Sequence, residues 1–90
     1  MKVVWAPGAL ADYRWWRAED PKTADKIDRL IEDIKRSAFA GIGKPEPLKQ
    51  DMAGLWSRRI DKEHRFVYRK VGKRGKDQRL EILQCRFHYR

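Results

Sequence analysis

The sequence has little of what defines several large protein classes. Cys85 is its only cysteine, so no disulfide can form within the chain and cysteine cannot supply a metal cage. No apolar run approaches the roughly 20 residues that span a bilayer, and no signal-peptide pattern opens the chain. These absences favour a cytoplasmic protein without a membrane partner over a secreted, disulfide-rich or membrane protein.

Metal and nucleotide motifs are also scarce. The chain has two histidines and no clustered carboxylates, which argues against a metal site, and its one glycine-rich stretch, "AGIGKPEP", lacks the spacing of a phosphate loop. The chain contains no internal repeat, linker or low-complexity tract. We therefore expect one domain over residues 1–90 that uses neither a metal nor a cofactor.

Positive charge is the most pronounced feature that is present. There are 22 Lys and Arg against 13 Asp and Glu, which gives a net charge of +9 and a pI near 10.1. Residues 1–57 carry 10 basic and 9 acidic side chains, whereas residues 58–90 carry 12 and 4. Such a one-sided field attracts polyanions such as nucleic acid. A well-solvated surface and an acidic protein partner remain open as alternatives.

The first half of the chain predicts a strand and a helical hairpin. "KVVW" at 2–5 is a short β-branched run, and residues 9–18 carry apolar side chains at helical spacing. Asp20-Pro21 is typical of a helix start, an N-cap acceptor followed by proline. Ile27, Leu30, Ile31 and Ile34 then form a complete apolar stripe on the second helix.

The second half predicts strands. Residues 39–49 read as a loop, residues 55–60 and 65–71 as strands around a turn at 61–64, and residues 72–78 as a longer basic hairpin loop. A last strand is predicted from residue 79 to the C-terminus. The order β-α-α-β-β-β predicts an α+β, two-layer fold, with two N-terminal helices on one face of a mainly antiparallel sheet.

Alternation along these strands predicts what lies on the uncovered face of the sheet. Residues two apart point the same way. This places Arg59, Arg65, Arg69, Arg86 and His88 on that face, opposite an apolar one. We therefore expect a basic groove on the open side of the sheet.

Three residues are candidates for chemistry. His88 can exchange a proton near neutral pH, although a lone histidine can equally sit at a frayed chain end. Glu46 is held between Pro45 and Pro47 and can act as a base or join a surface ion pair. Arg65 can bind and stabilise a phosphate, or it can be a solvated strand arginine.

Other residues are candidates for binding, because the cations exceed what one mechanism needs. The predicted RNA-binding set comprises Lys44, Lys49, Arg58, Arg59, Arg69 and Arg86. Trp56 and Tyr89 can stack on bases, although both fall on the apolar side of their strands, where core packing is the alternative. His64 falls in the predicted turn and receives no role.

A carboxylate, an arginine and a histidine around a basic groove suit metal-free RNA cleavage. The base removes the 2′-hydroxyl proton, the oxygen attacks the adjacent phosphate, and the acid protonates the departing 5′-oxygen. DNA lacks the 2′-hydroxyl, so the same residues cannot cut it this way.

Longer motifs resemble a known family. "KPEPLK", "GLWSRRI", "EHRFVY" and the terminal "CRFHY" are similar to the YoeB toxins of the RelE/ParE superfamily, in the same order and along essentially the whole chain. The resemblance implies a toxin that cleaves messenger RNA in the ribosomal A site, forms a homodimer and is neutralised by a YefM-type antitoxin.

The resemblance also implies roles for individual residues. Glu46 would be the general base, Arg65 would stabilise the phosphate, His88 would be the general acid and Tyr89 would position the substrate, with Lys49 and Arg59 as supporting binders. The hairpin "VGKRGKDQRL" is longer and more basic than the family pattern, and Arg90 follows the usual terminal tyrosine. The extra charge suggests added contacts with ribosomal RNA.

Two other functions remain open from the residues. A ParE-like toxin shares this fold and acts on DNA gyrase, but it has no use for Glu46, Arg65 and His88 together. A non-catalytic RNA-binding module needs only the basic half of the chain, and substitution of His88 would then have little effect.

Overall fold

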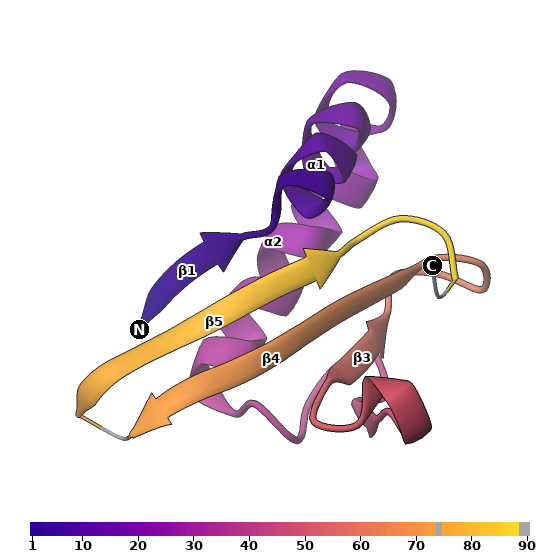
Figure 1. Ribbon diagram of the computed structural model, residues 1–90. Helices are drawn as coiled ribbons and strands as arrows, with labels where there is room; N and C mark the ends of the chain where they lie inside the picture. The colour runs from indigo at the N-terminus through magenta and orange to yellow at the C-terminus, as the bar shows by residue number, and fades with distance from the viewer. Residues whose placement is uncertain (74, 89–90) are drawn as a thin grey trace.

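A computed structural model describes residues 1–73 and 75–88 of the chain and shows two helices and a five-stranded sheet (Figure 1). The elements are β1 (Lys2–Trp5), α1 (Pro7–Glu19), α2 (Pro21–Arg36), β2 (Glu46–Pro47), β3 (Trp56–Arg59), β4 (Arg65–Lys73) and β5 (Lys76–Gln84), with a 3₁₀ turn at Gln50–Met52. The predicted α+β fold is confirmed.

The strand order is β1-β5-β4-β3-β2. Strands β2 to β5 form an antiparallel series, and β1 joins its outer edge parallel to β5, with Val3 opposite Leu80. The two helices carry the chain from β1 to β2 at the opposite edge of the sheet, and β3, β4 and β5 then return it to the side of β1. The first and last strands of the described chain therefore lie side by side.

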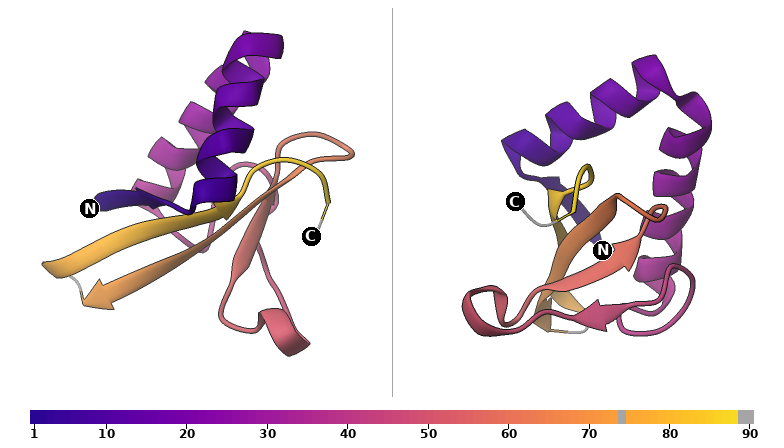
Figure 2. Two further views of the ribbon diagram at one scale, coloured as in Figure 1. Left: turned by 45° about the horizontal axis from the view of Figure 1, so that its top comes forward. Right: turned by 90° about the vertical axis from the view of Figure 1, so that its right-hand side faces the viewer.

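Both helices lie on the same side of the sheet, as the two views in Figure 2 show. The apolar stripe predicted on α2 is confirmed, because Ile27, Leu30, Ile31 and Ile34 are all buried. They pack in one core with sheet residues that include Phe66. Burial of this apolar surface is the main stabilising contribution in a domain of this size.

Asp20 forms the junction between the helices. Its backbone N–H donates to Trp16 at the end of α1, and its carboxylate accepts hydrogen bonds from the backbone N–H (3.3 Å) and hydroxyl (2.7 Å) of Thr23 at the start of α2. Pro21 occupies the first helical position, where a missing N–H costs nothing. The predicted start of the second helix is confirmed.

Three predicted boundaries are wrong. The segment predicted as a loop contains β2, a two-residue strand paired with β3. The predicted loop at 72–78 is shorter, because β4 continues to Lys73 and β5 begins at Lys76. The last strand ends at Gln84, and the chain leaves the sheet at Cys85 instead of continuing as a strand.

Arg58 is a buried structural residue, and its predicted place in the RNA-binding set is wrong. Its side chain is 0% exposed and lies on the helix side of β3. The guanidinium forms an ion pair with Asp33 and donates to Tyr68 and to the carbonyls of Ser37, Ala40 and Ile42. These contacts fasten the segment after α2 to the sheet.

Two ionisable groups beside Arg58 have shifted pKa values, for different reasons. The hydrogen bond from Arg58 is the main reason that the pKa of Asp33 lies below its ordinary value. Burial raises the pKa of the Tyr68 hydroxyl, which donates to the carbonyl of Ala38 at 2.6 Å.

In the described part of the chain, no helix is long and apolar enough to cross a membrane.

Candidate active site

A pocket of about 180 Å³ opens on the sheet, beside the β2–β3 edge. It is lined by Lys44, Glu46, Ser57, Arg59, Arg65 and His88. The structure thus brings together the three residues predicted for chemistry and two of the predicted binding cations. They come from five parts of the chain: the segment before β2, β2, β3, the start of β4, and the tail after β5.

Glu46 is positioned by backbone pairing with β3. It lies opposite Ser57, and two flanking hydrogen bonds hold the segment, from Arg59 N–H to the Gly43 carbonyl (2.7 Å) and from Leu48 N–H to the Leu55 carbonyl (2.9 Å). Gly43 has a φ of +79°, and a Cβ there would lie 3.1 Å from the Arg59 carbonyl. This anchoring fixes an exposed carboxylate on the rim of the pocket.

Arg59 and Arg65 lie directly opposite each other on β3 and β4. Like charges in this arrangement repel each other and destabilise a sheet unless an anion lies between them. Lys44 adds a third cation to the same pocket, against the single carboxylate of Glu46. The pocket therefore has the charge distribution of a phosphate site with one carboxylate beside it.

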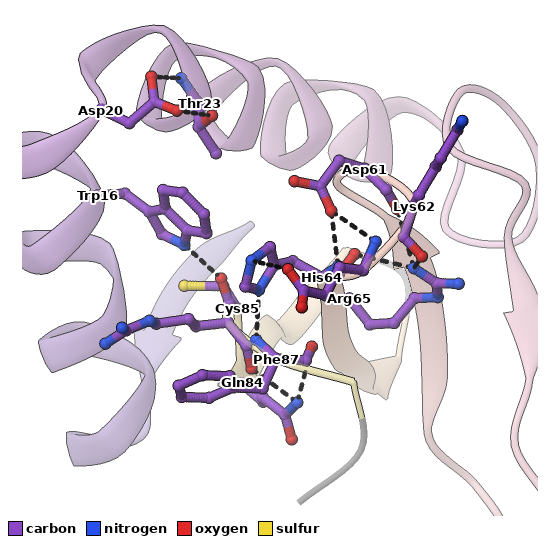
Figure 3. Close-up of polar contacts among 12 residues, drawn as sticks. Trp16, Asp20, Thr23, Asp61, Lys62, His64, Arg65, Gln84, Cys85 and Phe87 are labelled. Atoms are coloured by element: carbon purple, nitrogen blue, oxygen red, sulfur yellow. Dashed lines mark hydrogen bonds and ion pairs between the residues drawn. The ribbon is translucent and has the colours of Figure 1, made fainter.

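The turn between β3 and β4 fixes the position of Arg65 (Figure 3). Its Nη1 donates to the carbonyls of Asp61 (2.9 Å), Lys62 (3.3 Å) and His64 (3.1 Å). Within the described residues, no hydrogen bond uses its Nε or Nη2. One edge of the guanidinium is thus tied to the protein, and the other can bind an anion.

The carboxylate of Asp61 organises this turn. It accepts hydrogen bonds from the backbone N–H groups of Glu63 (2.8 Å) and His64 (2.7 Å). Burial acts to raise the pKa of Asp61, but these two hydrogen bonds outweigh it and lower the pKa below the ordinary value. The turn is therefore most stable with Asp61 ionised.

The C-terminal tail carries His88 to the pocket by folding back, and not by continuing β5. Phe87 adopts a φ of +66°, an uncommon conformation for a bulky residue. Its carbonyl accepts from the backbone N–H of Arg65 at 2.9 Å. The side-chain amide of Gln84 donates to the carbonyls of Arg86 and His88. The strand alternation predicted for the tail is therefore wrong, although His88 reaches the predicted face.

His64 anchors the tail, which the sequence did not predict. Its Nδ1 accepts a hydrogen bond from the backbone N–H of Phe87 at 2.7 Å (Figure 3). This contact requires an unprotonated Nδ1 and so fixes the tautomer with hydrogen on Nε2, which lies 3.3 Å from the carboxylate of Glu63. The imidazole also packs edge-on against Trp16, with ring centres 4.9 Å apart. His64 thus links the helix layer, the turn and the tail.

Several predicted binding residues lie outside the pocket. Lys49 is exposed beyond β2, and Arg69 is paired with Glu81 on the neighbouring strand. Arg86 lies between aromatic rings, 3.5 Å from the ring centre of Trp15. Tyr89 and Arg90 lie outside the described residues. Trp56 is half-buried and packs against Phe39, with ring centres 4.7 Å apart.

The described residues contain no group of three or more His, Cys, Asp and Glu side chains placed to hold a metal ion. What the pocket offers is one carboxylate, one imidazole and three cationic groups. Those groups can accept a proton, donate a proton and stabilise a phosphate.

The chain resembles known proteins over nearly its full length. Residues 5–89 match the family described as "YoeB-like toxin of bacterial type II toxin-antitoxin system". The chain is 45% identical over 89 residues to Toxin YoeB of Escherichia coli K12, covering 99% of this chain and 100% of that protein. It is 51% identical over 87 residues to Toxin RelK of Mycobacterium tuberculosis, covering 97% and 96%.

Solved structures agree with this match. A YoeB/ParE toxin from Agrobacterium tumefaciens superposes with a TM-score of 0.94 at 57% identity, covering 99% of this chain and 100% of that one. A YoeB dimer from Staphylococcus aureus superposes with a TM-score of 0.87 at 40% identity, covering 99% and 98%. A mutant of YafQ from E. coli, at 12% identity and a TM-score of 0.76, shares the fold.

Proposed function

Because this chain belongs to the YoeB-like toxins of bacterial type II toxin-antitoxin systems, we propose that it is a ribosome-dependent endoribonuclease that cleaves messenger RNA in the A site. The observation that carries the proposal is the meeting of Glu46, Arg65 and His88 in one pocket. They are separated by 19 and 23 residues in the sequence and come together only through the fold.

The proposed reaction is a transesterification within the RNA, in which the phosphorus exchanges its bond to the 5′-oxygen for a bond to the 2′-oxygen. Glu46 takes the proton of the 2′-hydroxyl, and the 2′-oxygen forms a bond to the adjacent phosphorus. The bond from phosphorus to the 5′-oxygen breaks, and His88 donates a proton to that oxygen. The products are a 2′,3′-cyclic phosphate and a free 5′-hydroxyl, so no water is consumed in this step, and the proposed base, acid and cations are all side chains of the protein.

The cations of the pocket stabilise the charge that develops during this step. Arg65 presents the unbonded edge of its guanidinium, and Arg59 and Lys44 line the same pocket. Pre-positioned donors of this kind are effective because they need no reorganisation when the phosphate becomes crowded. Ser57, opposite Glu46 on β3, supplies a further polar group to the pocket wall.

The proposal is tested by cleavage of a defined messenger RNA on purified 70S ribosomes. Wild-type protein should cut in the A site and leave a cyclic phosphate. Glu46→Gln and His88→Gln should each lower the single-turnover rate at least about a hundredfold, in the range expected for a lost general base or acid. Asp51→Asn, a nearby exposed carboxylate outside the pocket, should cleave like the wild type.

A second substrate separates this mechanism from others. A messenger with one 2′-deoxynucleotide before the scissile phosphate should resist cleavage, whereas the same substitution one nucleotide away should not. Equal cleavage of both would overturn the proposed attack by the 2′-oxygen. No cleavage by the wild-type protein would overturn the nuclease function and make gyrase inhibition, the ParE-like alternative, the next activity to measure.

We also propose that the chain pairs with itself and with a YefM-type antitoxin. Relatives from S. aureus at 39–40% identity form a YoeB dimer and a heterotetrameric YoeB-YefM complex. An acidic antitoxin segment would suit the cationic pocket found here. Size-exclusion chromatography with light scattering, on the chain alone and with its antitoxin, measures both assemblies.

A further inference from the structure

We propose that the tip of the β4–β5 hairpin, together with the start of β1, is a second RNA-binding surface that contacts ribosomal RNA away from the active site. We call this surface the basic arm and define it by Lys2, Lys73 and Lys76. All three side chains are exposed. The inference rests on the proposed function, because it assigns the arm to the same ribosomal target.

The charges of the basic arm are not neutralised within the protein. Lys73 and Lys76 lie directly opposite each other across the hairpin, an arrangement that repels unless an anion is bound. Among the described residues, none of the three lysines is within 4.0 Å of a carboxylate oxygen, and Asp77 near the tip forms no ion pair. By contrast, both neighbouring arginines, Arg69 and Arg79, are paired with Glu81.

The arm has hollows beside these cations. One of about 270 Å³ is lined by Gly72, Lys73, Lys76 and Asp77, and another of about 340 Å³ lies between Met1, Lys2 and the strand that begins at Lys76. The backbone at the tip is closely packed, since a Cβ on Gly72, whose φ is +90°, would lie 2.2 Å from the Asp77 carbonyl. Exposed lysines around such hollows suit phosphate groups that project from an RNA surface.

The arm is too far from the active site to bind the same nucleotide. Arg65 begins β4 and Lys73 ends it, and a strand rises about 3.3 Å per residue, so the two lie roughly 25 Å apart. Figure 1 shows the hairpin tip and the described C-terminal tail at opposite ends of the molecule. A messenger bound at the A site is surrounded by ribosomal RNA, which is the polyanion available at that distance.

Composition favours RNA over a protein partner on this surface. Protein interfaces are depleted in lysine and are anchored by aromatic side chains. The exposed large apolar residues of the described chain are Met1, Trp15, Phe39, Ile42 and Phe87, and only Met1 lies at the arm. Exposed lysines without apolar anchors are instead typical of binding to the phosphate backbone of a nucleic acid, where counterion release supplies much of the affinity.

The test compares two variants that lose the same charge. Lys73→Gln/Lys76→Gln neutralises the arm, and Lys22→Gln/Lys35→Gln removes two exposed lysines from α2. Binding to 70S ribosomes carrying a defined messenger is measured by sedimentation from 50 to 200 mM KCl at constant Mg²⁺. Single-turnover cleavage is measured at saturating ribosomes.

The arm variant should bind more weakly at low salt and lose less affinity as salt rises. Two lost phosphate contacts reduce the slope of log K against log salt by about 1.4 to 1.8. The Kd of the arm variant divided by the Kd of the wild type should therefore fall about tenfold between 50 and 200 mM KCl. Its cleavage rate at saturation should equal that of the wild type, and the α2 variant should match the wild type in both measurements.

The outcomes separate the two proposals. If the wild type cleaves but the arm and α2 variants bind ribosomes alike, the arm proposal is wrong and the nuclease function stands. If the arm variant keeps its ribosome affinity and loses affinity for an acidic antitoxin segment instead, the arm binds protein and not RNA. If the wild type neither binds nor cleaves, the proposed function fails before the arm is tested.

Discussion

Replacing Arg58 by lysine keeps a positive charge but changes how many partners it can satisfy. The guanidinium donates to five groups: the carboxylate of Asp33, the hydroxyl of Tyr68, and the carbonyls of Ser37, Ala40 and Ile42. A lysine ammonium has three donors, so at least two of the five acceptors lose their hydrogen bond.

The expected cost follows from that count. An acceptor left unsatisfied in a buried site costs about 1–3 kcal/mol, and the loop carbonyls lie nearer the surface, at the lower end of this range. We therefore expect Arg58→Lys to lower the free energy of unfolding by about 2–4 kcal/mol. For a domain of this size the corresponding fall in Tm is at least about 8 °C.

Arg59→Lys is the matched control. It is the same substitution at the next residue of β3, whose side chain lies on the opposite face of the sheet. Arg59 is exposed and lines the pocket, so the unfolding free energy should change by less than about 0.5 kcal/mol. Its effect should fall on messenger cleavage, since lysine cannot bind a phosphate in two-pronged fashion. Urea unfolding followed by circular dichroism, with cleavage measured in parallel, gives both readouts. Equal stability of Arg58→Lys and wild type would refute the structural role of Arg58.

Two further predictions concern the tail and the turn. His64→Leu removes the acceptor for Phe87 N–H and should therefore misplace His88. Cleavage at saturating ribosomes should slow about 10- to 100-fold, while ribosome affinity stays unchanged. His64→Gln offers an amide oxygen as acceptor and should recover part of the rate. Equal rates for Leu and Gln would refute this positioning role. The pKa of Asp61 is lower in the folded than in the unfolded state, so the stability it contributes is present above about pH 4 and lost as pH falls through the folded value. Urea midpoints from pH 7 to pH 2.5 should therefore fall less for Asp61→Asn than for wild type, and parallel curves would contradict this.

Regular elements could be predicted from the sequence because their signals are local. The stripe on α2 and the Asp20-Pro21 junction depend on side chains three or four residues apart, and both are confirmed. Residues 46–47 carry no strand signal of their own, since Pro47 favours a loop. Their pairing with β3 is a tertiary contact that no local pattern records.

The site residues could be predicted by type, but the way they meet could not. Side-chain chemistry and the family resemblance predict Glu46, Arg65 and His88, whereas the reversal at Phe87 depends on Gln84, His64 and the β3–β4 turn. Strand alternation places Arg58 on the helix-covered face, but its charge favours a binding role. Only the structure shows that Asp33 and three carbonyls surround it. Asp33, a partly exposed acid in the last turn of the preceding helix, gives no sequence signal for that pairing.

The parallel pairing of β1 with β5 has a consequence for how the protein is made. The first strand leaves the ribosome early, but its neighbour in the sheet, and the tail that brings His88 to Glu46, are synthesised much later. Contacts between residues so far apart in the sequence form late and slowly. A nascent chain in which β5 and the tail are still inside the ribosome therefore lacks both the completed sheet and the assembled pocket. The proposed nuclease activity can begin only after these segments have emerged and folded against the rest of the protein.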